Sequence, residues 1–166
     1  IYREIMSEKK IIAVIGMPGS GKSTVIEDLV QKHNLPFVYF GGLTLEEVRR
    51  RGLPETQENE KKIRQEFREK YGMGAYAHLS LPKIKELLEK SDVMLIDGLY
   101  SWSEYILLKK ANIGEVILLS IISKRKKRYE RLQKRSVRPL TPEEAEKRDI
   151  AEIENLEKGG PIALCD

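Results

Sequence analysis

The stretch "IIAVIGMPGSGKST", residues 11–24, decides the fold of this 166-residue chain. Its second part, "GMPGSGKS" (residues 16–23), fits the pattern G-x-x-x-x-G-K-[S/T] in full. The apolar run before it, residues 11–16, is typical of a buried strand. A helix is expected over residues 22–32, where apolar side chains recur at helical spacing. Strand, glycine-rich turn and helix in this order predict a phosphate-binding loop.

The chemistry of such a loop follows from its residue types. Its glycines let backbone N–H groups turn inward on a phosphate, and the start of the following helix adds a positive dipole end. Lys22 is expected to reach the β- and γ-phosphates of ATP, and the Ser23 hydroxyl to ligate Mg²⁺. The predicted ATP-binding residues are Gly16, Met17, Pro18, Gly19, Ser20, Gly21, Lys22, Ser23 and Thr24.

Further apolar runs predict strands over residues 37–40, 93–98 and 116–121. Helices are expected between them, over residues 44–52 with a Thr44–Glu47 capping box, over 54–71, and again in a segment interrupted around Gly72, Gly74 and Pro82. A last helix is expected from the Thr141 cap to about residue 158. Apolar strands alternating with helices indicate an α/β fold with a parallel sheet.

The carboxyl ends of parallel strands are where such folds bind ligands, and Gly16, Gly41 and Asp97 all fall there. Asp97 closes an apolar strand, as an acid that holds Mg²⁺ through water does. The alternative is a cap on the turn that follows the strand.

Composition is that of a soluble globular protein, with 40% apolar and 34% charged residues. We expect one domain over residues 1–166, no membrane association and no targeting segment. The lone Cys165 excludes an internal disulfide and favours a reducing, cytoplasmic location. The closing "IALCD", residues 162–166, is typical of the approach to another strand.

Positive charge is concentrated in "KRKKRYERLQKRSVR", residues 124–138, which holds nine bases and one acid, whereas the whole chain has a net charge of only +4. A phosphate clamp, a solvated helix and a nucleic-acid surface are three interpretations of this segment. On a helix, Lys124, Arg128, Arg131 and Arg135 share one face. Guanidinium groups suit phosphate oxygens. The absence of an aromatic-interleaved platform argues against nucleic acid as the partner.

Taken together, "GMPGSGKST", "LIDG" (residues 95–98), "RLQKR" (131–135) and "RPLTPEEAEKRD" (138–149) resemble the adenylate kinase family of nucleotide kinases. The chain is most similar to archaeal adenylate-kinase-related, dephospho-CoA-kinase-like proteins. The resemblance implies a three-layer αβα P-loop domain with a helical acceptor insert at residues 41–80 and a short arginine-rich lid loop at residues 134–142.

The resemblance also implies roles for individual residues. Catalysis would fall to Lys22, Arg131, Arg135, Arg138 and Arg148, and the metal would be held by Ser23 and Asp97. Acceptor-binding residues would be Gly41, Gly42, Arg49, Arg68, Tyr76, Gly98 and Tyr100. The chain departs from the family where acceptor-phosphate arginines are usual, because Leu45 and the "YS" pair at residues 100–101 stand there. Arg49, Arg64 and Arg68 are the candidates to replace them.

The resulting expectation is ATP-dependent phosphoryl transfer to a nucleoside monophosphate, AMP first, with small-molecule nucleotides as the partners. Two alternatives are a dephospho-CoA-type kinase and a nucleotide-binding ATPase or regulator with an altered acceptor site. Among the remaining residues, we interpret His33 as a helix-end or surface residue and Trp102 as a core residue. His78 is retained as an acceptor-site candidate. The two histidines and one cysteine offer no zinc spacing.

Overall fold

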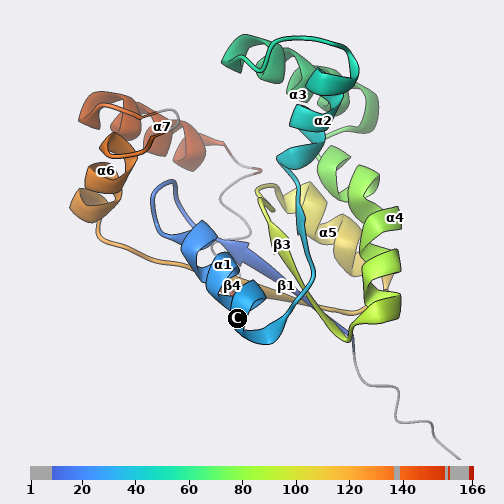
Figure 1. Ribbon diagram of the computed structural model, residues 1–166. Coiled ribbons are helices and arrows are strands. Elements are labelled where there is room, and N and C mark those ends of the chain that lie inside the picture. Colours follow the sequence, from blue (N-terminus) through green and yellow to red (C-terminus); the bar gives the residue numbers. More distant parts are fainter. Residues whose placement is uncertain (1–8, 137–138, 156, 158–164) are drawn as a thin grey trace, which may run out of the picture.

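A parallel sheet forms the centre of the computed structural model, which describes residues 9–136, 139–155, 157 and 165–166 (Figure 1). Within these residues the strands are β1 (Lys10–Ile15), β2 (Phe37–Tyr39), β3 (Val93–Asp97) and β4 (Glu115–Ser120). Their order across the sheet is β2-β3-β1-β4, and every neighbouring pair is parallel. The apolar runs in the sequence therefore predicted the strands correctly, to within a residue or two at their ends.

Helices cover both faces of the sheet. The described helices are α1 (Lys22–His33), α2 (Gly42–Arg50), α3 (Gln57–Tyr71), α4 (Ala75–Lys90), α5 (Trp102–Ala111), α6 (Arg125–Gln133) and α7 (Pro142–Glu154). On one face, Ile26 of α1 packs against Val14 and Leu95. On the other, Ile84 of α4 and Leu108 of α5 belong to the larger core. The α/β fold with a parallel sheet is thus confirmed.

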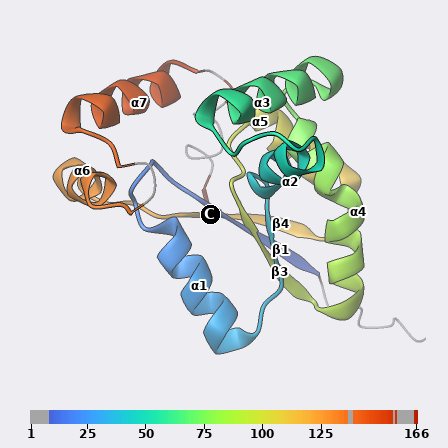
Figure 2. The same cartoon turned by 45° about the horizontal axis from the view of Figure 1, so that its top comes forward.

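The two remaining helix pairs stand on opposite sides of the phosphate loop. Figures 1 and 2 show α2 and α3 on the side of α4, and α6 and α7 across the loop from them. Because β1 and β3 both end in this region, the arrangement surrounds the carboxyl ends of the strands with helices. The helical insert expected at residues 41–80 corresponds to α2, α3 and the first part of α4.

Of the two capping boxes predicted from the sequence, one forms and the other does not. The Thr141–Glu144 capping box forms at the start of α7, with Pro142 in the first turn, as predicted. The Thr44–Glu47 box does not form, because α2 already begins at Gly42 and the Thr44 hydroxyl is bonded to the Tyr76 hydroxyl at 2.6 Å. The Glu47 carboxylate instead accepts hydrogen bonds from Arg50 and Arg51.

Helix α4 contradicts the expected interruption at Pro82. Proline removes one backbone donor and so weakens a helix interior. Here the helix nevertheless continues from Ala75 to Lys90, because Ala77, Ile84 and Leu88 bury its inner face in the core. Helix α5 was not anticipated. Its start carries a capping box between Ser101 and Glu104, which is the sequence signal that would have found it.

Three other expectations concern chain segments rather than the core. Trp102 is 39% exposed and lies against Tyr105, so it is not the core residue that was expected. Residues 162–164 of the closing apolar run lie outside the described residues; the Asp166 N–H donates to the Leu118 carbonyl at 3.1 Å. No helix among the described residues is long and apolar enough to span a bilayer.

Candidate nucleotide-binding site

The phosphate loop joins β1 to α1, and its shape depends on close backbone approaches. At Gly16, with φ +139°, a β-carbon would lie 2.5 Å from the Ile121 carbonyl oxygen. At Gly19, with φ +77°, it would lie 2.6 Å from the Arg128 carbonyl oxygen. Since a side chain fits neither place, the sequence can form this loop only with glycine there.

The Lys22 side chain folds back over the loop that precedes it. Its ammonium group donates to the carbonyl oxygens of Gly16 at 2.7 Å and Met17 at 3.2 Å. Burial lowers the pKa of Lys22 to about 8; the Asp97 carboxylate opposes this shift, while nearby Arg135 and Arg148 add to it. The structure therefore gathers two of the predicted lid arginines and the predicted metal acid around the loop lysine.

The loop also fits the phosphate and Mg²⁺ that the sequence implies. The Ser20 hydroxyl is buried inside the loop and has no hydrogen-bond partner among the described residues. Such an orphaned hydroxyl can donate to a phosphate oxygen. Ser23, in the first turn of α1, is exposed, and Asp97 ends β3. Burial raises the pKa of Asp97 and Lys22 opposes the shift, so a cation bound beside this carboxylate would stabilise its charged form.

The arginines predicted to form the lid lie in different surroundings. Helix α6 ends at Gln133, so Arg135 lies beyond it and does not extend a helical arginine face as expected. Arg131 donates to the Ser20 carbonyl oxygen at 2.9 Å. Arg148 is exposed on α7, near Lys22. Arg138 lies outside the described residues.

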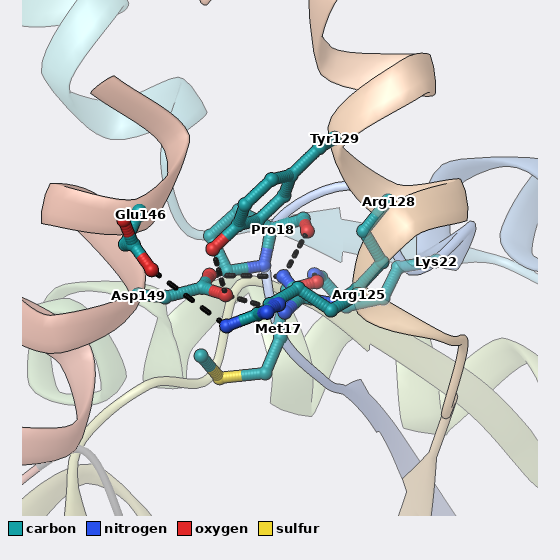
Figure 3. A network of polar contacts seen from close by, with 8 residues as sticks. All are labelled: Met17, Pro18, Lys22, Arg125, Arg128, Tyr129, Glu146 and Asp149. Atoms are coloured by element: carbon teal, nitrogen blue, oxygen red, sulfur yellow. Dashed lines mark hydrogen bonds and ion pairs between the residues drawn. The ribbon is translucent and has the colours of Figure 1, made fainter. Parts of the chain in front are cut away.

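Arg128 is only 7% exposed and does not face solvent as a free phosphate ligand would. Its guanidinium forms two hydrogen bonds with the Asp149 carboxylate of α7, one of them 2.9 Å long (Figure 3). It also donates to the Pro18 carbonyl oxygen at 3.0 Å. The basic face that the sequence indicated is therefore partly built into the protein interior.

On the acceptor side, Tyr100 follows β3 and faces several charged groups. Desolvation, Asp97, Tyr39 and Glu152 raise the pKa of its phenol, and Arg148 opposes them. Gly98 keeps φ at +91° in the turn after Asp97. Glu152 was not anticipated. It lies four residues after Arg148 on α7, so helical spacing from a predicted lid residue was the available signal.

Other acceptor candidates differ in their availability. The Tyr39 ring covers Gly41, where a β-carbon would collide with it, and Gly42 begins α2. Arg49 is bonded to Glu55 on the exposed surface, at 2.7 Å. Arg68 is half-buried near Tyr76 and Glu104, and among the described residues its side chain has no hydrogen-bond or ion-pair partner.

Two further candidates, Tyr76 and His78, contact other side chains of the protein. Tyr76 is 6% exposed in the core, and its hydroxyl is bonded to Thr44, so its side chain is not free to contact an acceptor. His78 is exposed on α4 and stacks on Tyr71, with ring centroids 5.2 Å apart. His33 is the last residue of α1 and is exposed, in agreement with its interpretation as a helix-end residue.

Fold and loop together define an α/β P-loop domain, and comparison with known proteins agrees. The profile of the AAA domain family matches residues 12–153. A UPF0200 protein of Thermococcus sibiricus is 38% identical over 94% of this chain and 83% of its own length. Another, of Pyrococcus abyssi, is 40% identical over 94% of this chain and 84% of its own length. The chain therefore belongs to the AAA domain family and to the UPF0200 proteins.

Solved structures extend the likeness of fold to kinases. A putative kinase from Chloroflexus aurantiacus gives a TM-score of 0.60 at 16% identity, covering 85% of this chain and 75% of its own. A sugar kinase from Janibacter gives a TM-score of 0.53 at 16% identity, covering 90% of this chain and 80% of its own. At such identity the comparison establishes a P-loop kinase-like fold and nothing about the substrate.

Proposed function

We propose that the protein transfers the γ-phosphoryl group of ATP to a nucleoside monophosphate, with AMP the first candidate. The observation that carries this proposal is the complete phosphate loop with Lys22 folded over it, between a buried strand and a helix. Arg135 and Arg148 lie near the same lysine, which suits a reaction dominated by positioning and charge neutralisation.

The proposed reaction is a direct displacement. A phosphate oxygen of the acceptor bonds to the γ-phosphorus, and the bond from that phosphorus to the β–γ bridging oxygen breaks, so that ADP leaves. Lys22 neutralises charge on the β- and γ-phosphates, and Arg135 and Arg148 neutralise charge on the transferring group. Mg²⁺, when bound, would be held by Ser23 and Asp97 and would offset the charge on the phosphates.

The acceptor would lie between the insert and α7, in the space bordered by Tyr100. Arg68 is the strongest candidate for its phosphate, since its side chain is half-buried and has no hydrogen-bond or ion-pair partner among the described residues. Arg49 is a weaker one, because Glu55 already neutralises it. Gly41, Gly42 and Gly98 would then let the acceptor approach the backbone closely.

ADP formation from ATP, measured with AMP, CMP, UMP, GMP, dephospho-CoA or no acceptor, tests the proposal. We expect turnover to rise most with AMP; a rise with dephospho-CoA alone would support the dephospho-CoA kinase instead. Lys22→Met should lower turnover by about 10²–10³-fold. Lys32→Met, at the exposed end of α1, is the matched control and should leave turnover unchanged.

A second candidate function is a nucleotide-binding ATPase or regulator. It is favoured by the ion pair that turns Arg49 toward Glu55 and by Leu45 and Tyr100 at the usual places of acceptor arginines. ATP hydrolysis that none of the five acceptors accelerates would support this function over the kinase.

A further inference from the structure

The buried ion pair between Arg128 and Asp149 joins three parts of the protein that are far apart in the sequence. Arg128 lies on α6, Asp149 lies on α7, and the same guanidinium reaches the phosphate loop at the Pro18 carbonyl (Figure 3). The two residues are 7% and 6% exposed. Tyr129 adds a hydrogen bond from its hydroxyl to the Asp149 carboxylate at 3.2 Å. A single side chain thus connects the phosphate loop, α6 and α7.

Arg131, one turn further along α6, contacts the next carbonyls of the loop. Its Nη1 atom donates to Gly19 at 3.2 Å and to Ser20 at 2.9 Å. Together with the Arg128 contact, three consecutive loop carbonyls accept hydrogen bonds from the arginines of α6. This helix forms the outer wall of the phosphate loop.

These carbonyl contacts affect the face of the loop that binds an anion. In a trans peptide unit, the C=O and the following N–H point in opposite directions. Holding the carbonyls of Pro18 and Ser20 toward α6 therefore turns the N–H groups of Gly19 and Gly21 away from α6. Inward N–H groups of this kind are what a phosphate loop uses to bind its ligand.

We propose that Arg128 and Asp149 are positioning residues that lock the phosphate loop to α6 and α7 and thereby set the affinity for the phosphates of a nucleotide. This rests on the proposed nucleotide binding of the loop. Arg128 contacts the loop through the Pro18 carbonyl, on the side opposite the N–H groups that would face a phosphate. Asp149 fixes the direction of the guanidinium, so that Nη1 reaches Pro18, and it holds α7 beside the loop.

The same ion pair also fixes the position of Arg148, the neighbouring arginine on α7. Asp149 directly follows Arg148, which lies near enough to Lys22 to lower its pKa. An exposed ion pair would not hold α7 in one position, since such pairs contribute little to stability. A buried, bidentate pair with a third contact to the loop keeps Arg148 near Lys22 in the nucleotide-free protein.

The test separates positioning from simple structural support by measuring affinity as well as stability. In the double variant Arg128→Met/Asp149→Leu, both charges are replaced by apolar groups of similar size, a change that buried ion pairs often tolerate. Met17, Ile150 and Ile153 line the same groove and offer an apolar environment for the new side chains. We expect binding of Mg-ADP, measured by calorimetry well below the unfolding temperature, to weaken at least tenfold.

A matched control breaks the other ion pair between the same helices. Glu146→Gln removes the exposed contact of Glu146 with Arg125, 3.6 Å long, and should change the affinity for Mg-ADP less than twofold. Asp149→Asn provides a second variant should the double variant fail to fold. It keeps an acceptor for one of the two hydrogen bonds, so a loss of about three- to tenfold in affinity is expected.

The inference is overturned if the folded double variant, or Asp149→Asn, binds Mg-ADP as tightly as the wild type, even with a lowered unfolding temperature. That result would leave Arg128 and Asp149 as structural residues only, with nucleotide binding intact. If the wild type itself bound neither Mg-ADP nor Mg-ATP, the proposed function would fall, and this inference with it. The wild-type titration therefore distinguishes the two failures.

Discussion

Replacement of Gly19 by alanine tests the close contact between the phosphate loop and α6. Gly19 has φ +77°, which costs a residue with a side chain about 1–2 kcal/mol. The added β-carbon would also lie 2.6 Å from the Arg128 carbonyl oxygen and 3.0 Å from Leu132. Overpacking of this kind typically costs about 1–3 kcal/mol. We therefore expect Gly19→Ala to lower the free energy of unfolding by about 2–5 kcal/mol.

Gly52→Ala is the matched control for this prediction. Gly52 also has a positive φ, +65°, but a β-carbon there would meet nothing within 4 Å. Its substitution should carry only the backbone cost, together with the same small gain from a stiffer unfolded chain. Unfolding by guanidinium chloride, with equal slopes for both variants, measures the difference. Equal losses for Gly19→Ala and Gly52→Ala would mean that α6 does not pack on the loop as described.

Three further predictions address the site and the core. The pKa of Lys22 is about 8 and bound phosphates favour its charged form, so Mg-ADP affinity should be constant below pH 7, fall about tenfold between pH 7 and 9, and lose this dependence in Lys22→Met. Calorimetry in buffers of different ionisation enthalpy should detect proton uptake on binding near pH 8. An affinity independent of pH would contradict the shifted pKa. Ile63→Ala, at a fully buried position of α3, should lower the free energy of unfolding by about 2–5 kcal/mol in denaturant titrations, whereas Ile122→Ala, at an 86% exposed position, should change it by less than about 0.5 kcal/mol. Tyr76→Phe should lower the free energy of unfolding by about 1–3 kcal/mol, because it leaves the buried Thr44 hydroxyl without its partner. Adding Thr44→Val should restore most of this loss. A second loss of equal size would show that the two hydroxyls do not form a pair.

The strands and the phosphate loop were predictable because their signals are local. A run such as residues 11–16 has no polar face, which is typical of a strand buried on both sides. The loop carries its glycines at fixed spacing for steric reasons that the contacts at Gly16 make explicit. The same holds for the cap of α7, where Thr141 and Glu144 bond each other's backbone. Each of these features depends on residues only a few positions apart.

What the sequence did not predict depends on contacts between distant segments. Pro82 weakens a helix locally, but burial of Ile84 and Leu88 overrides it. Arg128 and Asp149 are 21 residues apart in a region crowded with charges, and no local pattern selects this pair. The sequence alone therefore placed Arg128 on one helical face with Arg131 and Arg135, among the candidate phosphate ligands. Only the packing of α6 against α7 and the loop identifies it as a buried residue.

The charges around Lys22 suggest why so much arginine is gathered beside one loop. Burial is the main reason that the charged form of this lysine is disfavoured; Arg135 and Arg148 disfavour it further, while Asp97 and Glu152 favour it. Lys22, Arg135 and Arg148 repel one another, and the carboxylates of Asp97 and Glu152 offset that repulsion. The buried pair of Arg128 with Asp149 holds α6 and α7 together beside these groups. Phosphates that bind here would relieve the repulsion, so part of their affinity would come from charge that the fold has already assembled.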